Sequence, residues 1–155
     1  SWFRDSTVGV THNGTGAFVD SVYVNPLGPT QAMNADGHVM KMIMTGQKTG
    51  TNAVAEIQFR WGGGFNFSLD LPAAAATWKV EVTAFMTGAS AQTMVIDKYY
   101  VSGGTETRTP LTISETVNLA TTTQNWRVGD NTASGDSIVY ETVEMFGSVA
   151  GYGVS

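Results

Sequence analysis

The sequence predicts an all-β protein, a jelly-roll-like β-sandwich of about eight to ten antiparallel strands. Apolar and polar residues alternate with a period of two along most of the chain, as in strands with one buried face. Segments rich in Gly, Asn and Asp separate these stretches and supply the backbone angles that tight turns need. No window shows the apolar periodicity of an amphipathic helix, so strands account for the ordered segments.

The expected strands follow one another at short intervals. The clearest is AVAEIQFRW at 53–61, in which Ala, Ile, Phe and Trp alternate with Glu, Gln and Arg. The segment TWKVEVTAFMT at 77–87 alternates in a similar way. In chain order we expect strands at 5–11, 17–24, 38–45, 53–61, 77–87, 92–101, 111–119, 123–128 and 136–146.

The connecting segments carry turn residues. NADG at 34–37 and GDNTASGD at 129–136 supply Asn, Asp and Gly for turns. GGG at 62–64 predicts a tight link or a bulge, and VSGGTE at 101–106 predicts a hairpin. PAAAAT at 72–77 is compatible with one helical turn, for which Pro72 and Thr77 leave little room.

Length and composition limit the classes of protein to consider. The 155 residues match a single sandwich domain over 1–155, which we expect to be part of a longer chain. The net charge is -5, and the eight Lys and Arg residues form no cluster, which argues against a nucleic-acid partner. No apolar run reaches the roughly 18–20 residues of a membrane span, so we expect no membrane insertion. The chain has no cysteine and therefore no disulfide framework.

The surface is expected to be neutral and rich in hydroxyl groups. Charged residues make up 14% of the chain, against roughly 25% in an average globular domain. Thr, Ser, Gly, Asn and Gln take their place. This profile is common in extracellular and virion β-proteins.

Residues for nucleophilic or metal chemistry are few. The only histidines, His12 and His38, fall in a predicted turn and at a strand start, and no GxSxG motif accompanies them. Two histidines without cysteine make zinc unfavourable. Asp130, Asn131 and Asp136 offer oxygen ligands but lack the spacing of a calcium loop, so that segment indicates a turn. We expect no catalytic residue, no cofactor and no metal.

Paired carboxylates are the remaining enzymatic option, because glycosidases need two acids at a suitable separation. Glu141 and Glu144 are three positions apart on a strand and therefore face opposite sides. The other candidates each lie on the polar face of a predicted strand, which favours solvated positions: Glu56, Glu81, Asp97 and Glu115.

Aromatic residues are the better candidates for binding, because sugar rings stack on flat apolar faces. Trp61 and Trp78 occupy predicted core positions. Trp126 is flanked by polar residues and precedes Arg127, so it is a candidate exposed platform. Tyr99 and Tyr100 are adjacent in a strand, so one of them must face away from the other. We expect a ligand site at Trp126 and Arg127 or at this tyrosine pair.

The segment NADGHVMKMIMTGQ predicts a strand that is apolar on both faces. Met40, Met42 and Met44 form one face, and Val39 and Ile43 belong to the other. Such a strand lies either between two packed layers of its own domain or against another copy of the chain. Methionine is unbranched and adaptable, which suits an interface where strands cross irregularly.

Four segments, in this order, resemble a known family: NADGHVMKMIMTG, TNAVAEIQFRWGG, TWKVEVTAFMTGASAQTMVI and SGDSIVYETVEMFGSV. The order resembles that of the C-terminal β-sandwich domains of bacteriophage tail fibres and tailspikes over roughly residues 30–148. The methionine-rich strand and the region 5–29 depart from the family pattern.

This resemblance implies a virion protein of the phage tail whose domain assembles as a homotrimer. In that family such domains cap a fibrous stem, promote trimer formation or contact host-surface polysaccharide, and any enzymatic activity usually lies in the preceding stem. One of the two faces of strand 38–45 would then meet a neighbouring subunit. Two alternatives remain: a capsid or head-fibre decoration module without glycan binding, and a carbohydrate-active enzyme using paired carboxylates.

Overall fold

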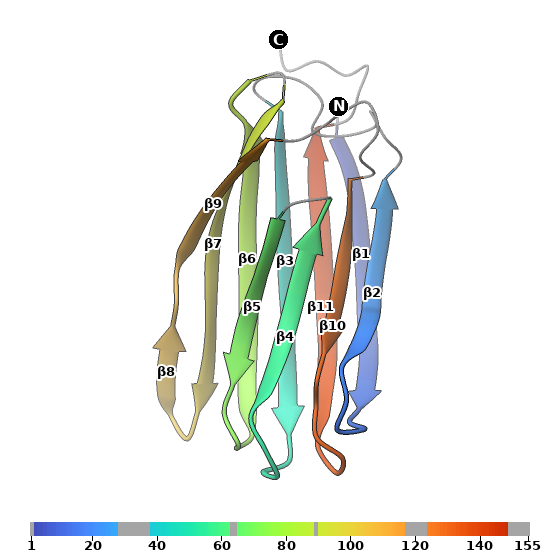
Figure 1. Cartoon of the computed structure of the whole chain (residues 1–155), viewed down its shortest axis with the longest axis vertical. Helices are drawn as coiled ribbons and strands as arrows, with labels where there is room; N and C mark the ends of the chain where they lie inside the picture. Colours follow the sequence, from blue (N-terminus) through green and yellow to red (C-terminus); the bar gives the residue numbers. More distant parts are fainter. Residues whose placement is uncertain (1, 28–37, 63–64, 89, 117–123, 149–155) are drawn as a thin grey trace.

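The computed structural model describes residues 2–27, 38–62, 65–88, 90–116 and 124–148. These residues form eleven strands in two antiparallel sheets that pack face to face (Figure 1). The all-β sandwich is therefore confirmed, with eleven strands where about eight to ten were expected. Within the described residues, no helix is long and apolar enough to cross a membrane.

The larger sheet has seven strands in the order β1-β11-β3-β6-β7-β8, and β9 pairs with the same edge of β7. The smaller sheet has four strands in the order β2-β10-β4-β5. The strands of the larger sheet are β1 (Trp2–Asn13), β3 (Val39–Thr49), β6 (Ala76–Met86), β7 (Ala91–Ser102), β8 (Thr105–Arg108), β9 (Leu111–Thr116) and β11 (Ser137–Ser148). Those of the smaller sheet are β2 (Val19–Leu27), β4 (Ala55–Trp61), β5 (Phe65–Leu71) and β10 (Gln124–Asp130).

The strand order is that of a jelly roll. The first strand pairs with the last, β1 with β11, and the pairs β2–β10, β3–β6 and β4–β5 follow inside it. These eight strands are one long antiparallel hairpin wound into two sheets. The strands β7, β8 and β9 are inserted between β6 and β10, and they extend the larger sheet beyond the eight-stranded unit (Figure 1).

Aromatic rings of the smaller sheet fill much of the space between the layers. The rings of Phe59 and Phe67 stack with centroids 4.9 Å apart and planes 5° from parallel. Trp126 lies beside Trp61 at 5.3 Å and meets Phe67 edge-on at 6.1 Å. All four rings are buried. Offset and edge-on pairs of this kind stabilise a core beyond the area they bury.

The methionine strand is central in the larger sheet, between β11 and β6. Met40, Met42 and Met44 are 0% exposed and face the smaller sheet. Of the two faces expected to meet another subunit, the methionine face is therefore excluded, because it packs in the core of one chain. Val39 and Ile43 are half-buried on the outer face of the same strand.

The expected hairpin, helical turn and list of strands can each be compared with the structure. The hairpin at 101–106 is confirmed, with Gly103 and Gly104 at φ of 56° and 78° between β7 and β8. Both central residues need positive φ in such a turn, which favours glycine. The helical turn at 72–77 is wrong, because β6 begins at Ala76. The strands β5 and β8 were not among those expected.

Gly46 of β3 is a point of close packing in the larger sheet. The register of β11 shifts between Tyr140 and Thr142 opposite this glycine, so β11 carries one extra residue there. The Trp78 indole lies against Gly46 and meets the Tyr140 ring edge-on, with centroids 5.5 Å apart. A Cβ at position 46 would collide with this indole and with the Val139 carbonyl oxygen.

We therefore expect Gly46→Ala to lower the free energy of unfolding by about 1–3 kcal/mol, because the added methyl group must displace a well-packed ring. Urea unfolding monitored by tryptophan fluorescence measures the change. Gly88→Ala is the control, since a Cβ there meets only the Ala91 Cβ at 3.8 Å. Equal unfolding midpoints for the two variants would contradict the close packing at Gly46.

Candidate functional site

The outer face of the smaller sheet gathers polar side chains because the opposite positions fill the core. In β4 and β5 every second residue is buried, so the residues between them point away from the larger sheet. We call this surface the polar face and define it by Asp20, Glu56, Gln58, Arg60, Asn66, Ser68, Asp70 and Arg127.

One end of the polar face is basic. Arg127 of β10 is the register partner of Arg60 on β4, and Asn66 of β5 is the partner of Arg60 on its other side. Like charges directly opposite each other destabilise a sheet. Asp20 of β2 offsets this repulsion: its carboxylate forms an ion pair with Arg60 and accepts a hydrogen bond from Arg127 Nη2 at 2.7 Å. Burial, followed by the charge of Arg127, lowers the pKa of Arg60.

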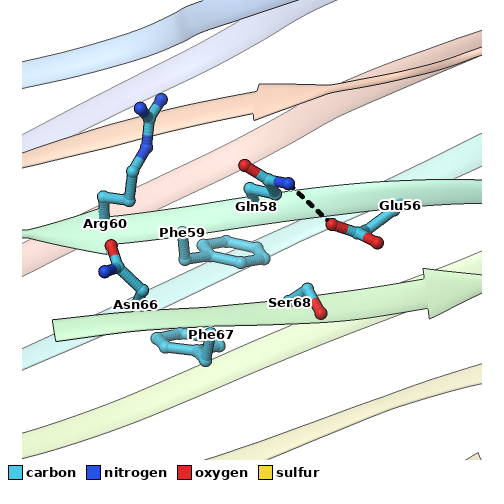
Figure 2. Close-up of a pocket in the computed structure, with 7 residues that line it drawn as sticks. All are labelled: Glu56, Gln58, Phe59, Arg60, Asn66, Phe67 and Ser68. Atoms are coloured by element: carbon cyan, nitrogen blue, oxygen red, sulfur yellow. Dashed lines mark hydrogen bonds between the residues drawn. The ribbon is translucent and has the colours of Figure 1, made fainter. Parts of the chain in front are cut away.

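The middle of the polar face is neutral. Gly129, Gln58 and Ser68 form one row across β10, β4 and β5. At the far end Glu56 and Asp70 are register partners, which makes that end acidic. Gln58 Nε2 donates a hydrogen bond to Glu56 Oε1 at 2.7 Å (Figure 2). The charge therefore changes from positive to negative along the strands, with amide and hydroxyl groups between.

A depression of about 410 Å³ lies on this face. Figure 2 shows the side chains that line it: Glu56, Gln58, Phe59 and Arg60 from β4, with Asn66, Phe67 and Ser68 from β5. The two phenylalanine rings are buried and stacked on each other, so the polar side chains provide the groups that a ligand can reach.

Phe18 adds an apolar ring beside the polar residues. It precedes β2 and is 41% exposed. A Cβ built on Gly129 would lie 3.0 Å from Phe18 Cζ and 2.9 Å from the Asp20 Cα. The missing side chain at Gly129 therefore lets the start of β2 and the Phe18 ring lie close against β10. An exposed aromatic ring beside amide, hydroxyl and charged groups is a combination that suits a sugar ring and its hydroxyl groups.

The four residues expected to bind a ligand do not come together. Trp126 is 0% exposed, so its assignment as an exposed platform is wrong; it faces the core in phase with the buried Val128. Its neighbour Arg127 is exposed and belongs to the polar face. Tyr99 and Tyr100 lie on β7 in the other sheet.

The tyrosine pair divides between the two sides of its sheet, as its adjacent positions require. Tyr100 packs against the core. Tyr99 is half-buried, and the guanidinium carbon of Arg108 lies 4.3 Å from its ring centroid. Arg108 in turn donates hydrogen bonds to Asp97 at 2.5 Å, which holds it over the ring. Tyr99 is therefore already covered by a cation.

The candidate binding residues that the sequence analysis did not name are Phe18 and the polar positions of β4 and β5. The alternation in FNFSLDL, which becomes β5, carried the signal for Asn66 and Ser68. Nothing local in the sequence indicates that Phe18 reaches Gly129.

Asp130 is a buried structural residue. Its carboxylate accepts hydrogen bonds from Tyr140 Oη at 2.6 Å, the Thr132 backbone N–H at 3.2 Å and the Thr132 hydroxyl. His12 Nδ1 lies 2.5 Å from Asp130 Oδ1, so His12 joins β1 to β10 and is not a turn residue. Burial, with the charge of Asp130, raises the pKa of Tyr140 and keeps its hydroxyl protonated.

Asp136 is the second buried carboxylate of the segment 129–136. Lys48 Nζ donates to Asp136 Oδ2 at 3.2 Å, and both side chains are fully buried. Asn52 Nδ2 donates at 2.9 Å, and the backbone N–H groups of Asn52 and Ala53 add further bonds. Within the described part of the chain, no group of three or more His, Asp or Glu side chains is placed to hold a metal ion.

Comparison with known proteins found a weak structural similarity and no sequence match. No protein-family model matches the chain, and no curated protein matches it in sequence. One chain of the solved "Structure of infectious bursal disease virus Gx strain" is similar over 97% of this chain, with a TM-score of 0.39 and 7% identity. This chain spans about a third (33%) of the length of that viral chain. At this level of similarity, the function has to be argued from the side chains of this protein.

The buried Asp136 predicts a specific dependence of stability on pH. Burial alone would raise its pKa, but the N–H groups of Asn52 and Ala53 and the Lys48 ammonium outweigh burial and hold the pKa below the ordinary value of 3.8. The stabilisation from this carboxylate is then complete above the ordinary pKa and is lost as the pH falls through the lower folded-state value.

We expect Asp136→Asn to be less stable than the wild type at neutral pH, and the difference to shrink below about pH 4. Chemical unfolding of both proteins at a series of pH values measures this difference in the free energy of unfolding. Asp97→Asn serves as the control, because its ion pair with Arg108 is exposed and contributes little. A wild-type advantage that stays constant down to about pH 2 would contradict the lowered pKa.

Proposed function

We propose that this chain is a non-enzymatic structural domain of a virion, from a phage tail fibre or tailspike, that attaches to host-surface polysaccharide through the polar face. The observation that carries this proposal is the exposed Phe18 ring against Gly129 of β10, at one end of the row in which Gln58 and Ser68 carry amide and hydroxyl groups. Function is argued from this site because a fold alone does not determine function.

The polar face has the chemical groups that sugar recognition uses. Gln58 and Asn66 each offer both donors and acceptors, as does the hydroxyl of Ser68, so all three can bond to sugar hydroxyl groups. Their positions on paired strands hold them in fixed spacing, about 4.8 Å between strands and about 7 Å between rows. Sites built on strands are positioned more accurately than sites on loops.

Two further features support the virion assignment. The strand order is that of a jelly roll, a topology shared by viral capsid and lectin domains. The order of motifs in the sequence resembles that of phage fibre domains over roughly residues 30–148. The neutral, hydroxyl-rich composition agrees with both.

The homotrimer is part of this proposal. With the methionine face inside the sandwich, the outer face of the larger sheet is the remaining candidate for the subunit boundary. Val39, Ile43, Phe85 and Phe146 are half-buried there, and Val95 is 47% exposed. These apolar side chains lie among charged ones, as at an interface that forms between folded subunits.

Binding of glycans can be tested with Phe18→Ala. If sugars stack on this ring, the variant should bind its best glycan about tenfold or more weakly, since one stacked ring contributes roughly 1–3 kcal/mol. A glycan array followed by titration calorimetry on the best hit measures the change. The matched control is Leu111→Ala, which truncates an exposed apolar residue on β9 of the other sheet, outside the proposed subunit boundary.

Equal affinities for Phe18→Ala and the wild type would exclude stacking on Phe18. No binding to any glycan on the array would favour the decoration module without a glycan site.

The trimer can be tested by light scattering on a size-exclusion column. We expect a mass near three chains for the wild type and near one chain for Ile43→Asp, because a carboxylate at the subunit boundary loses its hydration. Thr105→Asp on β8 is the control, since it adds the same charge at an exposed position. A monomeric wild type would contradict the trimer.

A further inference from the structure

The basic end of the polar face holds two arginines beside one aspartate. Arg60 and Arg127 are register partners, and the Asp20 carboxylate forms an ion pair with each of them. Among the residues that define the polar face, two guanidinium groups and one carboxylate give this end a positive charge, although the whole chain has a net charge of -5. The positive charge is therefore confined to this end of the polar face, and the composition of the chain does not predict it.

Arg60 also has an unused hydrogen-bond donor. Its side chain is 26% exposed, and its buried Nε has no acceptor within the described part of the chain. A buried donor without an acceptor costs free energy, and more when the group is charged. Figure 2 shows the Arg60 side chain extending from β4 on the side opposite Asn66. Because this Nε is buried, a ligand would meet Arg60 at the exposed part of its side chain.

The rest of the polar face determines how such a ligand would lie. Glu56 and Asp70 make the far end acidic, so an anionic group is repelled there and attracted to the arginine end. Between the two ends, Gln58 and Ser68 can bond to neutral hydroxyl groups. The face therefore fits a molecule that is anionic at one point and hydroxylated next to it.

We propose that the polar face selects acidic polysaccharides, with a sugar carboxylate or sulfate held by Arg60 and Arg127. This inference rests on the proposed function and names its ligand class. Arginine forms charge-assisted, often bidentate hydrogen bonds with such anions. The adjacent sugar ring lies over the neutral row toward Phe18, and Asp20 keeps both guanidinium groups in place.

The test compares three polysaccharides by titration calorimetry: polygalacturonate, which carries carboxylates, dextran sulfate, which carries sulfate esters, and neutral dextran. We expect one or both anionic polymers to bind at least tenfold more tightly than dextran. Which of the two binds identifies the anion. Because exposed charges are screened by salt, the affinity should fall as sodium chloride is added.

Substitutions of single charged residues test whether the anionic polymers bind to the polar face. Arg127→Gln, at an exposed position, should weaken anionic binding at least tenfold, and Arg60→Gln should do the same. Lys79→Gln is the matched control, because it removes the same charge from the other sheet, and it should bind as the wild type does. Circular dichroism and unfolding midpoints show that each variant keeps its fold.

The contrary outcomes separate this inference from the proposed function. Equal binding of dextran and the anionic polymers would overturn the selectivity and leave glycan attachment standing. Equal losses in Lys79→Gln and Arg127→Gln would overturn the assignment to the arginine pair. No binding of any of the three polymers, together with an empty glycan array, would overturn both.

Discussion

Phe59 and Phe67 are register partners of β4 and β5 whose rings stack in the core, and the whole polar face depends on that register. Side chains alternate with a period of two, so a slip of one residue would turn every side chain of a strand to the other face. A slip of β4 would carry Arg60 into the core, where an unpaired charge is very costly, and a slip of β5 would carry Asn66 there. The rings that hold the core together therefore also decide which groups a ligand meets outside.

Two buried carboxylates attach the turn that joins β10 to β11 to other strands of the sandwich. Asp130 connects this turn to His12 and Tyr140, and Asp136 connects it to Lys48 and Asn52. Both carboxylates accept several hydrogen bonds, which makes their burial tolerable. Oxygen-rich segments of this kind resemble metal loops in sequence, yet here the partners are side chains of the same protein.

Much of the fold could be predicted from sequence, because alternation is local and most strands have enough of it. The jelly-roll sandwich and the burial of Trp61 and Trp78 follow from that pattern. Trp126 could not be placed, because only it and Val128 mark the buried phase in a polar neighbourhood. The approach of Phe18 to Gly129 depends on pairing between distant segments, which a single sequence does not reveal.

The nesting of the strand pairs also determines how this protein must fold. Since β1 pairs with β11 and β2 with β10, the outer pairs join residues from opposite ends of the described chain. Closing such long loops costs entropy before any contact between them compensates, so topologies of this kind fold slowly. Until the outer pairs form, the edges of the inner strands remain open to other chains. Partly folded chains of this domain are therefore expected to associate more readily at high concentration, whatever the stability of the finished sandwich.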